Sequence, residues 1–256
     1  MPYAKNGDIN IYYEVEGEGQ PLVLLHGLTK SLDSWRERGY VDQLRNNYKL
    51  ILVDARGHGK SDKPHDPESY HSKDFSGDIT AILDDLNIQK ACFFGYSMGG
   101  AICLGLAKYA PERVKALIIG GVMPFERYPV KSNPLYKLLE AGGEAVVAYL
   151  EQAGPISDEM KARVLSNDYE AQIAMLNTIE PSLEDDLPHM DMPFLVFIGE
   201  TDELYPYQAV KEVYKKLPNR TFVSFPNLDH VQTINRSDLV LPHVTEFLTR
   251  VSKEVG

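Results

Sequence analysis

The chain shows two patterns of apolar residues, and each predicts a different kind of strand. Near the N-terminus, Ile9, Ile11, Tyr13 and Val15 alternate with polar residues after an Asn6-Gly7 turn, which predicts an antiparallel hairpin with one buried face. Further along, six mostly unbroken apolar runs have the length of strands, and such runs are typical of strands covered on both faces. The runs are residues 21–25, 50–53, 91–94, 116–119, 194–198 and 221–225.

Segments with helical spacing lie between these runs. Phe75, Ile79 and Ile82 belong to one apolar stripe, and Ser72 ahead of it is a candidate N-cap. Residues 17–19, with the sequence Gly-Glu-Gly, are interpreted as a hairpin loop. The alternation of strands and helices predicts an α/β fold with a mainly parallel sheet, helices on both of its faces, and ligands beyond the carboxyl ends of the strands.

Residues 124–190 interrupt this alternation. They contain several short helical stripes and no convincing strand, so we expect a helical cap inserted between core segments 1–123 and 191–256. The insertion carries seven more acidic than basic residues, out of a net charge of −11 for the whole chain. Such an acidic cap would repel anionic substrates if the acids lined the entrance. The alternative, which we favour, is that they form a solvated outer face.

Composition excludes several classes of function. The chain has 256 residues, 43% of them hydrophobic and 25% charged, which suits one large domain or two small ones. The excess of acidic residues argues against nucleic acid or an anionic membrane as a partner. Cys92 and Cys103 lie in apolar runs and are expected to be packed thiols rather than a disulfide or a metal site. Without a signal-peptide pattern or a long apolar stretch, we expect a cytoplasmic protein.

The strongest chemical signal is Gly95-Tyr96-Ser97-Met98-Gly99, which matches G-x-S-x-G. It follows the apolar run 91–94 and opens an apolar helix over residues 101–109, which is the context that makes the motif informative. A serine at the sharp corner between a strand and the next helix has its hydroxyl raised above the sheet. The helix that follows directs backbone N–H groups towards any anion that forms beside the serine. Ser97 is therefore the candidate nucleophile.

A serine hydroxyl needs a base, and the chain offers seven histidines. His230 lies just past the last predicted strand, the third place in the order serine, acid, histidine that this corner motif predicts. His26 and His58 also follow strands, but each lies beside a turn glycine and is expected to hold a loop by hydrogen bonding. His230 is therefore the candidate base.

The loop after strand 194–198 offers the carboxylate that should orient His230. Glu200 lies too close to the strand to reach the histidine, and Glu203 is expected to point into solvent. Asp229 is the direct sequence neighbour of His230 and is not expected to face its ring. Asp202 is the candidate acid by the same chain-order argument.

Together these residues resemble the α/β-hydrolase family over nearly the whole chain, in particular its capped branch of serine esterases and lactonases. The resemblance implies an eight-stranded sheet. It also implies that His26-Gly27 introduces the oxyanion loop, whose donors would be the backbone N–H groups of Leu28 and Met98, and that the loop 54–61 is structural. The serine at position 97 separates the chain from relatives that use an aspartate as nucleophile.

The expected activity is hydrolysis of small to medium, neutral or apolar carboxylic esters or lactones through an acyl-enzyme, with no metal or organic cofactor. Alternatives are cleavage of a carbon–carbon bond in a vinylogous diketone, and a ligand receptor with little turnover on the same fold. Neither the oligomeric state nor the acyl specificity follows from the sequence. Candidate residues for the substrate pocket are Trp35, Tyr96, Val122, Met123 and Val231. Helix packing is an equal alternative for Trp35, and filling of the core is the commoner role of a methionine.

Overall fold

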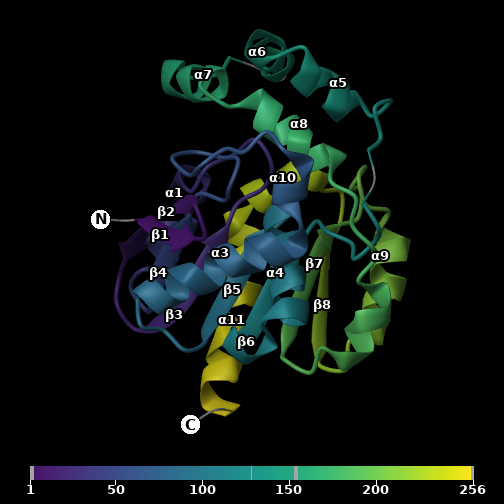
Figure 1. Ribbon diagram of the computed structural model, residues 1–256. Helices are drawn as coiled ribbons and strands as arrows, with labels where there is room; N and C mark the ends of the chain where they lie inside the picture. Colours follow the sequence, from purple (N-terminus) through teal and green to yellow (C-terminus); the bar gives the residue numbers. More distant parts are fainter. Residues whose placement is uncertain (1–2, 128, 153–154, 255–256) are drawn as a thin grey trace.

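A computed structural model describes residues 3–127, 129–152 and 155–254 (Figure 1). Residues 1–2 and 255–256 of the expected core, and residues 128 and 153–154 of the expected cap, lie outside the described residues.

One sheet of eight strands forms the centre of the molecule, in the order β1-β2-β4-β3-β5-β6-β7-β8 (Figure 1). β1 pairs antiparallel with β2, β2 pairs antiparallel with β4, and all other neighbours are parallel. The mainly parallel α/β sheet predicted from the sequence is thus confirmed, and each of the six apolar runs is a strand. The strands are β1 (Tyr3–Asn6), β2 (Ile9–Glu16), β3 (Gln20–Leu25), β4 (Tyr48–Val53), β5 (Ala91–Tyr96), β6 (Val114–Gly120), β7 (Phe194–Gly199) and β8 (Arg220–Phe225).

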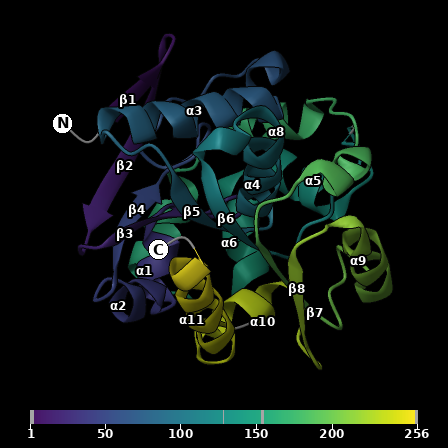
Figure 2. The ribbon, with the colours of Figure 1, turned by 90° about the horizontal axis from the view of Figure 1, so that it is seen from below.

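Helices cover both faces of the sheet (Figure 2). One face packs against α3 (Ser72–Asp85), α4 (Met98–Tyr109) and α9 (Tyr207–Val213). The other face packs against α1 (Asp33–Glu37), α2 (Tyr40–Leu44) and α11 (Ser237–Glu254). Strand residues alternate between the two apolar layers: Val23 of β3 packs in the first and Leu24 in the second. This double coverage explains why the central strands are continuous apolar runs.

Four helices gather beyond one end of the sheet (Figure 1). They are α5 (Pro134–Glu140), α6 (Gly143–Glu151), α7 (Asp158–Leu165) and α8 (Tyr169–Asn177). They share a small apolar cluster of their own, centred on Leu139, Val147 and Val164. We call them the helical segment α5–α8. Most acidic residues of the chain between residues 124 and 190 are exposed, as in the solvated-face interpretation.

Ser72 is not the N-cap of α3, contrary to the prediction. The helix begins at Ser72 itself, and the capping position is His71, which makes no side-chain capping bond. Instead, the Ser72 N–H donates to Glu180 Oε1 at 2.8 Å. A helix start needs acceptors for its free N–H groups, and here a distant carboxylate supplies one.

Two details at the N-terminal edge also differ from the predictions. Residues 17–19 do not form a hairpin loop, because β2 pairs with β4 rather than with β3. A Cβ on Gly17 would lie 2.3 Å from the Arg45 carbonyl oxygen, so this segment runs tightly past the chain that enters β4. In β2, Ile11 and Tyr13 are buried, but Val15 is 39% exposed. Val15 lies beyond residues 9–12, which pair with β1, so only β4 flanks it in the sheet.

Candidate active site

Ser97 sits at the sharp corner between β5 and α4. Its backbone is left-handed, with φ of 55° and ψ of −116°, a conformation that a non-glycine residue rarely adopts. The Ser97 N–H donates to the Gly120 carbonyl of the neighbouring strand at 2.8 Å. The flanking glycines are required by space: a Cβ on Gly95 would lie 2.1 Å from Gly99 O, and one on Gly99 would lie 1.9 Å from Leu25 O. The position of Ser97 between a strand and a helix, predicted from the motif, is confirmed.

His230 and Asp202 meet beyond the ends of β7 and β8. His230 Nδ1 lies 2.8 Å from Asp202 Oδ2, and the aspartate side chain is fully shielded from solvent. Asp202 Oδ1 accepts the N–H groups of Leu204 at 2.9 Å and Tyr205 at 3.0 Å. Glu200 instead accepts a hydrogen bond from the Ser224 hydroxyl and is exposed. Of the carboxylates considered, Asp202 is therefore the one that contacts His230.

The serine and the histidine reach the same edge of the sheet. The Ser97 N–H is hydrogen-bonded to the Gly120 carbonyl, and a Cβ on the next residue, Gly121, would lie 2.8 Å from His230 Cε1. The ring of Tyr96, directly before Ser97, has its centroid 5.1 Å from that of His230. In the described part of the chain, no hydrogen bond joins Ser97 Oγ to the His230 ring. Such bonds are often loose without substrate and tighten when it binds.

Two backbone N–H groups beside Ser97 make no hydrogen bond to any described residue. One belongs to Met98, the first residue of α4, and the other to Leu28, in the loop after β3. A Cβ on Gly27, next to Leu28, would lie 3.6 Å from Ser97 Cβ, so this loop runs against the serine. Free N–H groups at the start of a helix favour a bound anion.

Two buried histidines hold this loop and the loop after β4. His58 Nε2 accepts the Thr29 N–H, and His26 Nε2 accepts the Ala55 N–H, each at 3.2 Å. Burial lowers the pKa of His58 to about 3 and also lowers that of His26. Both rings are therefore neutral acceptors at ordinary pH. The expected loop-holding role of His26 and His58 is confirmed.

Comparison with known proteins gives the family. The family described as "alpha/beta hydrolase fold" matches residues 20–154, more than half of the chain. The chain is a member of the alpha/beta-hydrolase family. A Bacillus subtilis protein provisionally named 2-succinyl-6-hydroxy-2,4-cyclohexadiene-1-carboxylate synthase is 30% identical, over 94% of this chain and 96% of that protein.

Solved structures share the fold of this alpha/beta hydrolase. The enol-lactonase from Burkholderia xenovorans LB400 superposes with a TM-score of 0.82 at 24% identity, covering 97% of this chain and 100% of the other. The esterase RhEst1 from Rhodococcus sp. ECU1013 has a TM-score of 0.79, also at 24% identity, and covers 98% and 100% of the two chains. At this level of identity the likeness concerns the fold alone.

The predicted pocket residues of this alpha/beta hydrolase occupy different environments. Trp35 is buried in the core, with its ring centroid 5.2 Å from that of Tyr40 and 4.8 Å from that of Phe94. This environment agrees with the packing role given above as the alternative for Trp35. Val122 and Met123 are buried just after β6, whereas Val231 is 60% exposed beside His230. A pocket role for these residues stays a prediction.

Sequence reasoning missed two residues of this region. The Tyr205 ring lies 5.9 Å from that of His230, and its backbone N–H binds Asp202. An aspartate followed by a loop is typical of such a local turn, so this signal was available. Gly121 adopts a φ of +56°, and a Cβ there would collide with both Tyr96 and His230. Nothing in the sequence distinguishes Gly121 from its neighbour Gly120.

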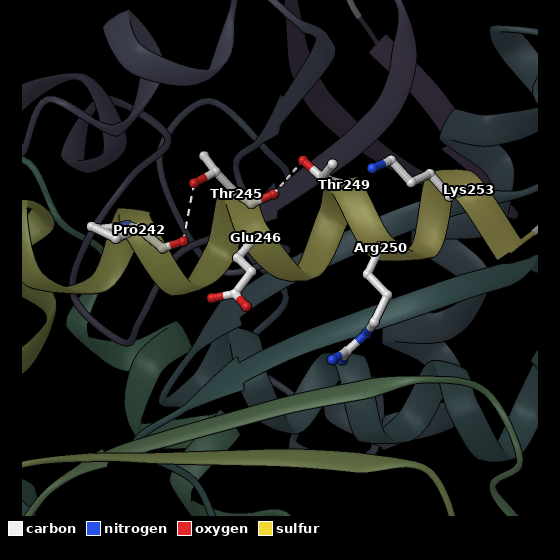
Figure 3. Close-up of a pocket in the computed structure, with 6 residues that line it drawn as sticks. All are labelled: Pro242, Thr245, Glu246, Thr249, Arg250 and Lys253. Atoms are coloured by element: carbon white, nitrogen blue, oxygen red, sulfur yellow. Dashed lines mark hydrogen bonds between the residues drawn. The ribbon is translucent and has the colours of Figure 1, made fainter.

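Other features of the alpha/beta hydrolase do not compete as sites. A shallow hollow on α11 has a single helix as its wall (Figure 3). Its lining residues are Pro242, Thr245, Glu246, Thr249, Arg250 and Lys253. Across residues 3–127, 129–152 and 155–254, no group of three or more histidine, cysteine or acidic side chains is arranged to hold a metal ion. None of the described helices is long and apolar enough to span a membrane.

Proposed function

We propose that the protein is a serine hydrolase that cleaves carboxylic esters or lactones through an acyl-enzyme. The observation that carries this proposal is the 2.8 Å contact between His230 Nδ1 and Asp202 Oδ2, at the sheet edge where Ser97 occupies a strained corner. A histidine that donates from Nδ1 to a carboxylate leaves Nε2 free to accept a proton. Ser97, Asp202 and His230 are the proposed catalytic residues.

In the proposed reaction, His230 Nε2 takes the proton of Ser97 Oγ as the oxygen attacks the carbonyl carbon of the substrate. The tetrahedral intermediate collapses, the alcohol leaves with the proton from His230, and the acyl group stays on Ser97. Water, deprotonated by His230, then attacks the acyl-enzyme and releases the acid and the free serine. Asp202 stabilises the imidazolium in both steps.

The free N–H groups of Leu28 and Met98 are the proposed donors to the oxyanion. Each lies next to Ser97, and neither is used within the described part of the chain. One such donor is typically worth about 3 to 4 kcal/mol of transition-state stabilisation. The dipole of α4 adds to this effect, because the helix begins directly at Met98.

We further propose that residues 124–190 act as a cap that shapes a pocket for small to medium, neutral or apolar substrates. The Leu28 side chain packs against both the core and the apolar cluster of the helical segment α5–α8. Val122 and Met123 add apolar surface after β6. Apolar walls with a few polar groups at the reacting centre are typical of small-molecule sites.

The experiment is hydrolysis of p-nitrophenyl acetate by Ser97→Ala and His230→Ala. Both should lower kcat on the order of 10⁴- to 10⁶-fold and keep the fold, as judged by circular dichroism. Ser166→Ala and His243→Ala are matched controls, because both residues are exposed, and they should keep wild-type turnover. A fluorophosphonate probe should label Ser97. Near-normal turnover by Ser97→Ala or His230→Ala would overturn the proposal.

Ester and lactone panels of graded acyl length then test the substrate class. Short to medium neutral acyl groups should give the highest kcat/KM. Release of a dienoate from a vinylogous diketone, at a rate above that of every ester, would favour carbon–carbon hydrolysis instead.

A further inference from the structure

Two buried tyrosine hydroxyls bind the short helix that carries His230. This helix is α10 (His230–Asn235). Tyr96 Oη donates to the His230 carbonyl at 2.6 Å, and Tyr40 Oη donates to the Ile234 carbonyl at 2.9 Å. The two bonds hold opposite ends of the same helix.

The two bonds do different things for the helix. The last four carbonyls of an α-helix lack a donor within the helix, and Ile234 lies in that last turn, so Tyr40 satisfies an otherwise free acceptor. His230 is the first residue of α10, and the helical ladder offers its carbonyl the N–H of the fifth residue. The bond from Tyr96 is therefore not needed to complete the helix. Its effect is to fix the position of the His230 main chain.

Tyr96 is itself held rigidly. It is the last residue of β5 and is 4% exposed. Its ring stacks on Phe197 of β7, with centroids 5.7 Å apart and planes at 30°. On another side the ring packs so closely against Gly121 that no larger residue would fit there, because a Cβ on Gly121 would lie 2.7 Å from Tyr96 Cζ. Because the ring cannot move, its hydrogen bond holds the His230 carbonyl at a fixed position relative to β5.

The phenol also remains a donor over the whole working pH range. Burial, followed by the nearby charge of Asp202, raises the pKa of Tyr96 far above its usual value. Tyr96 therefore keeps its proton and the bond to the His230 carbonyl.

We propose that Tyr96 is a positioning residue, which sets the distance between His230 Nε2 and Ser97 Oγ by tying the main chain of the histidine to the residue before the serine. Asp202 fixes the tautomer and tilt of the ring, and Tyr96 fixes where the ring is anchored. This role is distinct from the pocket role expected for Tyr96, which stays a prediction, and it rests on the proposed function of Ser97 and His230.

The test compares Tyr96→Phe with Tyr40→Phe. Each variant keeps its aromatic ring and loses one buried hydroxyl that donates to an α10 carbonyl. Tyr40→Phe leaves the Ile234 carbonyl without a donor, so it should lose at least as much stability as Tyr96→Phe, and a general loss of stability would show in both variants. Tyr96→Phe should lower kcat about tenfold or more and leave KM within about twofold, because displacement of a catalytic group slows chemistry more than binding. Tyr40→Phe should stay within about twofold of wild type in both constants. The rate of inactivation by a fluorophosphonate should follow kcat in the same order.

Replacement of Tyr96 by p-aminophenylalanine supplies the rescue, since an amine at the same place restores a donor. This variant should recover most of the kcat lost in Tyr96→Phe. Equal kcat values for Tyr96→Phe and Tyr40→Phe, or no rescue by the amine, would overturn the positioning role. Turnover that survives Ser97→Ala would overturn the proposed function instead, so the two failures are distinguishable.

Discussion

The rings of His26 and His58 lie edge to face, with their centroids 5.1 Å apart. Both are almost fully buried, and each accepts a backbone N–H from a loop at the carboxyl edge of the sheet. Protonation of either ring would remove an acceptor and place a charge beside the other ring. Protonation at acid pH should therefore both destabilise the folded protein and disturb the loop after β3, which carries Leu28.

This pair predicts acid sensitivity. The pKa of His58 is about 3 in the folded protein and about 6.5 when unfolded, so between these values only the unfolded chain binds the proton. The free energy of unfolding should then fall as pH drops below 6.5. His58 alone would account for about 2 kcal/mol between pH 7 and pH 5. Urea unfolding across this range measures the slope.

His58→Asn should flatten that slope, although it lowers stability at pH 7 by weakening the bond to Thr29. His243→Asn is the matched control, because His243 is exposed on α11, and it should leave the slope unchanged. Identical slopes in wild type and His58→Asn would show that His58 is not held neutral in the fold.

A second prediction concerns Arg56 and Asp78, which form an ion pair with two short contacts of 2.6 and 2.5 Å. Both side chains are more than 95% shielded, with 4% and 3% exposed. Asp78→Asn would leave the guanidinium buried without its counter-charge, which typically costs about 3–5 kcal/mol. Urea unfolding at pH 7 should show this loss as a lower midpoint concentration of urea, with an unchanged dependence of the unfolding free energy on urea concentration.

Asp84→Asn provides the comparison on the same helix. Asp84 pairs with Arg113 but is 70% exposed, so its loss should cost less than about 1 kcal/mol. If the two variants lost the same stability, burial of the Arg56–Asp78 pair would not be what stabilises it.

The sequence predicts the sheet well because the central strands are buried on both faces. Each apolar run from residue 21 to residue 225 therefore corresponds to a strand, with errors of one or two residues at its ends. The N-terminal edge is less predictable. Val15 alternates correctly but is exposed, and residues 17–19 look like a hairpin loop although β4 separates β2 from β3. Strand order is a tertiary property that local pattern does not encode.

The candidate site divides in the same way. Ser97, Asp202 and His230 each follow a strand, so strand ends and chain order are enough to select them. The start of α3 is bound by Glu180, which lies 108 residues away, and no local pattern indicates that partner. The hydroxyl of Tyr96 reaches a carbonyl 134 residues further along, and the same limit applies.

Histidine–carboxylate pairs on both sides of α8 predict that the attachment of this helix to the core depends on pH: His65 pairs with the start of α8, and His71 pairs with Glu180, which follows its end. His65 contacts Asp168 at 2.9 Å and Glu170 at 3.2 Å, and His71 contacts Glu180 at 2.9 Å and Glu68 at 3.2 Å. A hydrogen bond with Asp168 raises the pKa of His65, and a hydrogen bond with Glu68, aided by one with Glu180, raises that of His71.

Because both folded pKa values are raised, the pairs stabilise fully below the unfolded value of about 6.5 and weaken as pH rises through the higher folded values. Amide exchange in α8, corrected for the intrinsic pH dependence of exchange, should therefore speed up between pH 6 and pH 8. The double variant His65→Asn/His71→Asn should lose this dependence. Lys108→Met is the control. Lys108 contacts Asp186 and stays charged between pH 6 and pH 8, so loss of this contact should leave the wild-type pH dependence unchanged. An α8 exchange rate that is independent of pH in the wild type would contradict the prediction.

The last prediction separates the two carboxylates that follow β7. Asp202→Asn replaces an acceptor for His230 Nδ1–H with an amide that can donate to the ring, which favours the tautomer with its proton on Nε2. That proton would block Nε2 from acting as a base, so kcat should fall about 10⁴-fold with little change in KM. Glu200→Gln should stay within a few-fold of wild type, because the Glu200 side chain forms a hydrogen bond only with the Ser224 hydroxyl among the described residues. Steady-state kinetics on p-nitrophenyl acetate decide between them. A greater loss in Glu200→Gln than in Asp202→Asn would mean that the 2.8 Å contact of Asp202 with His230 is not the one used in catalysis.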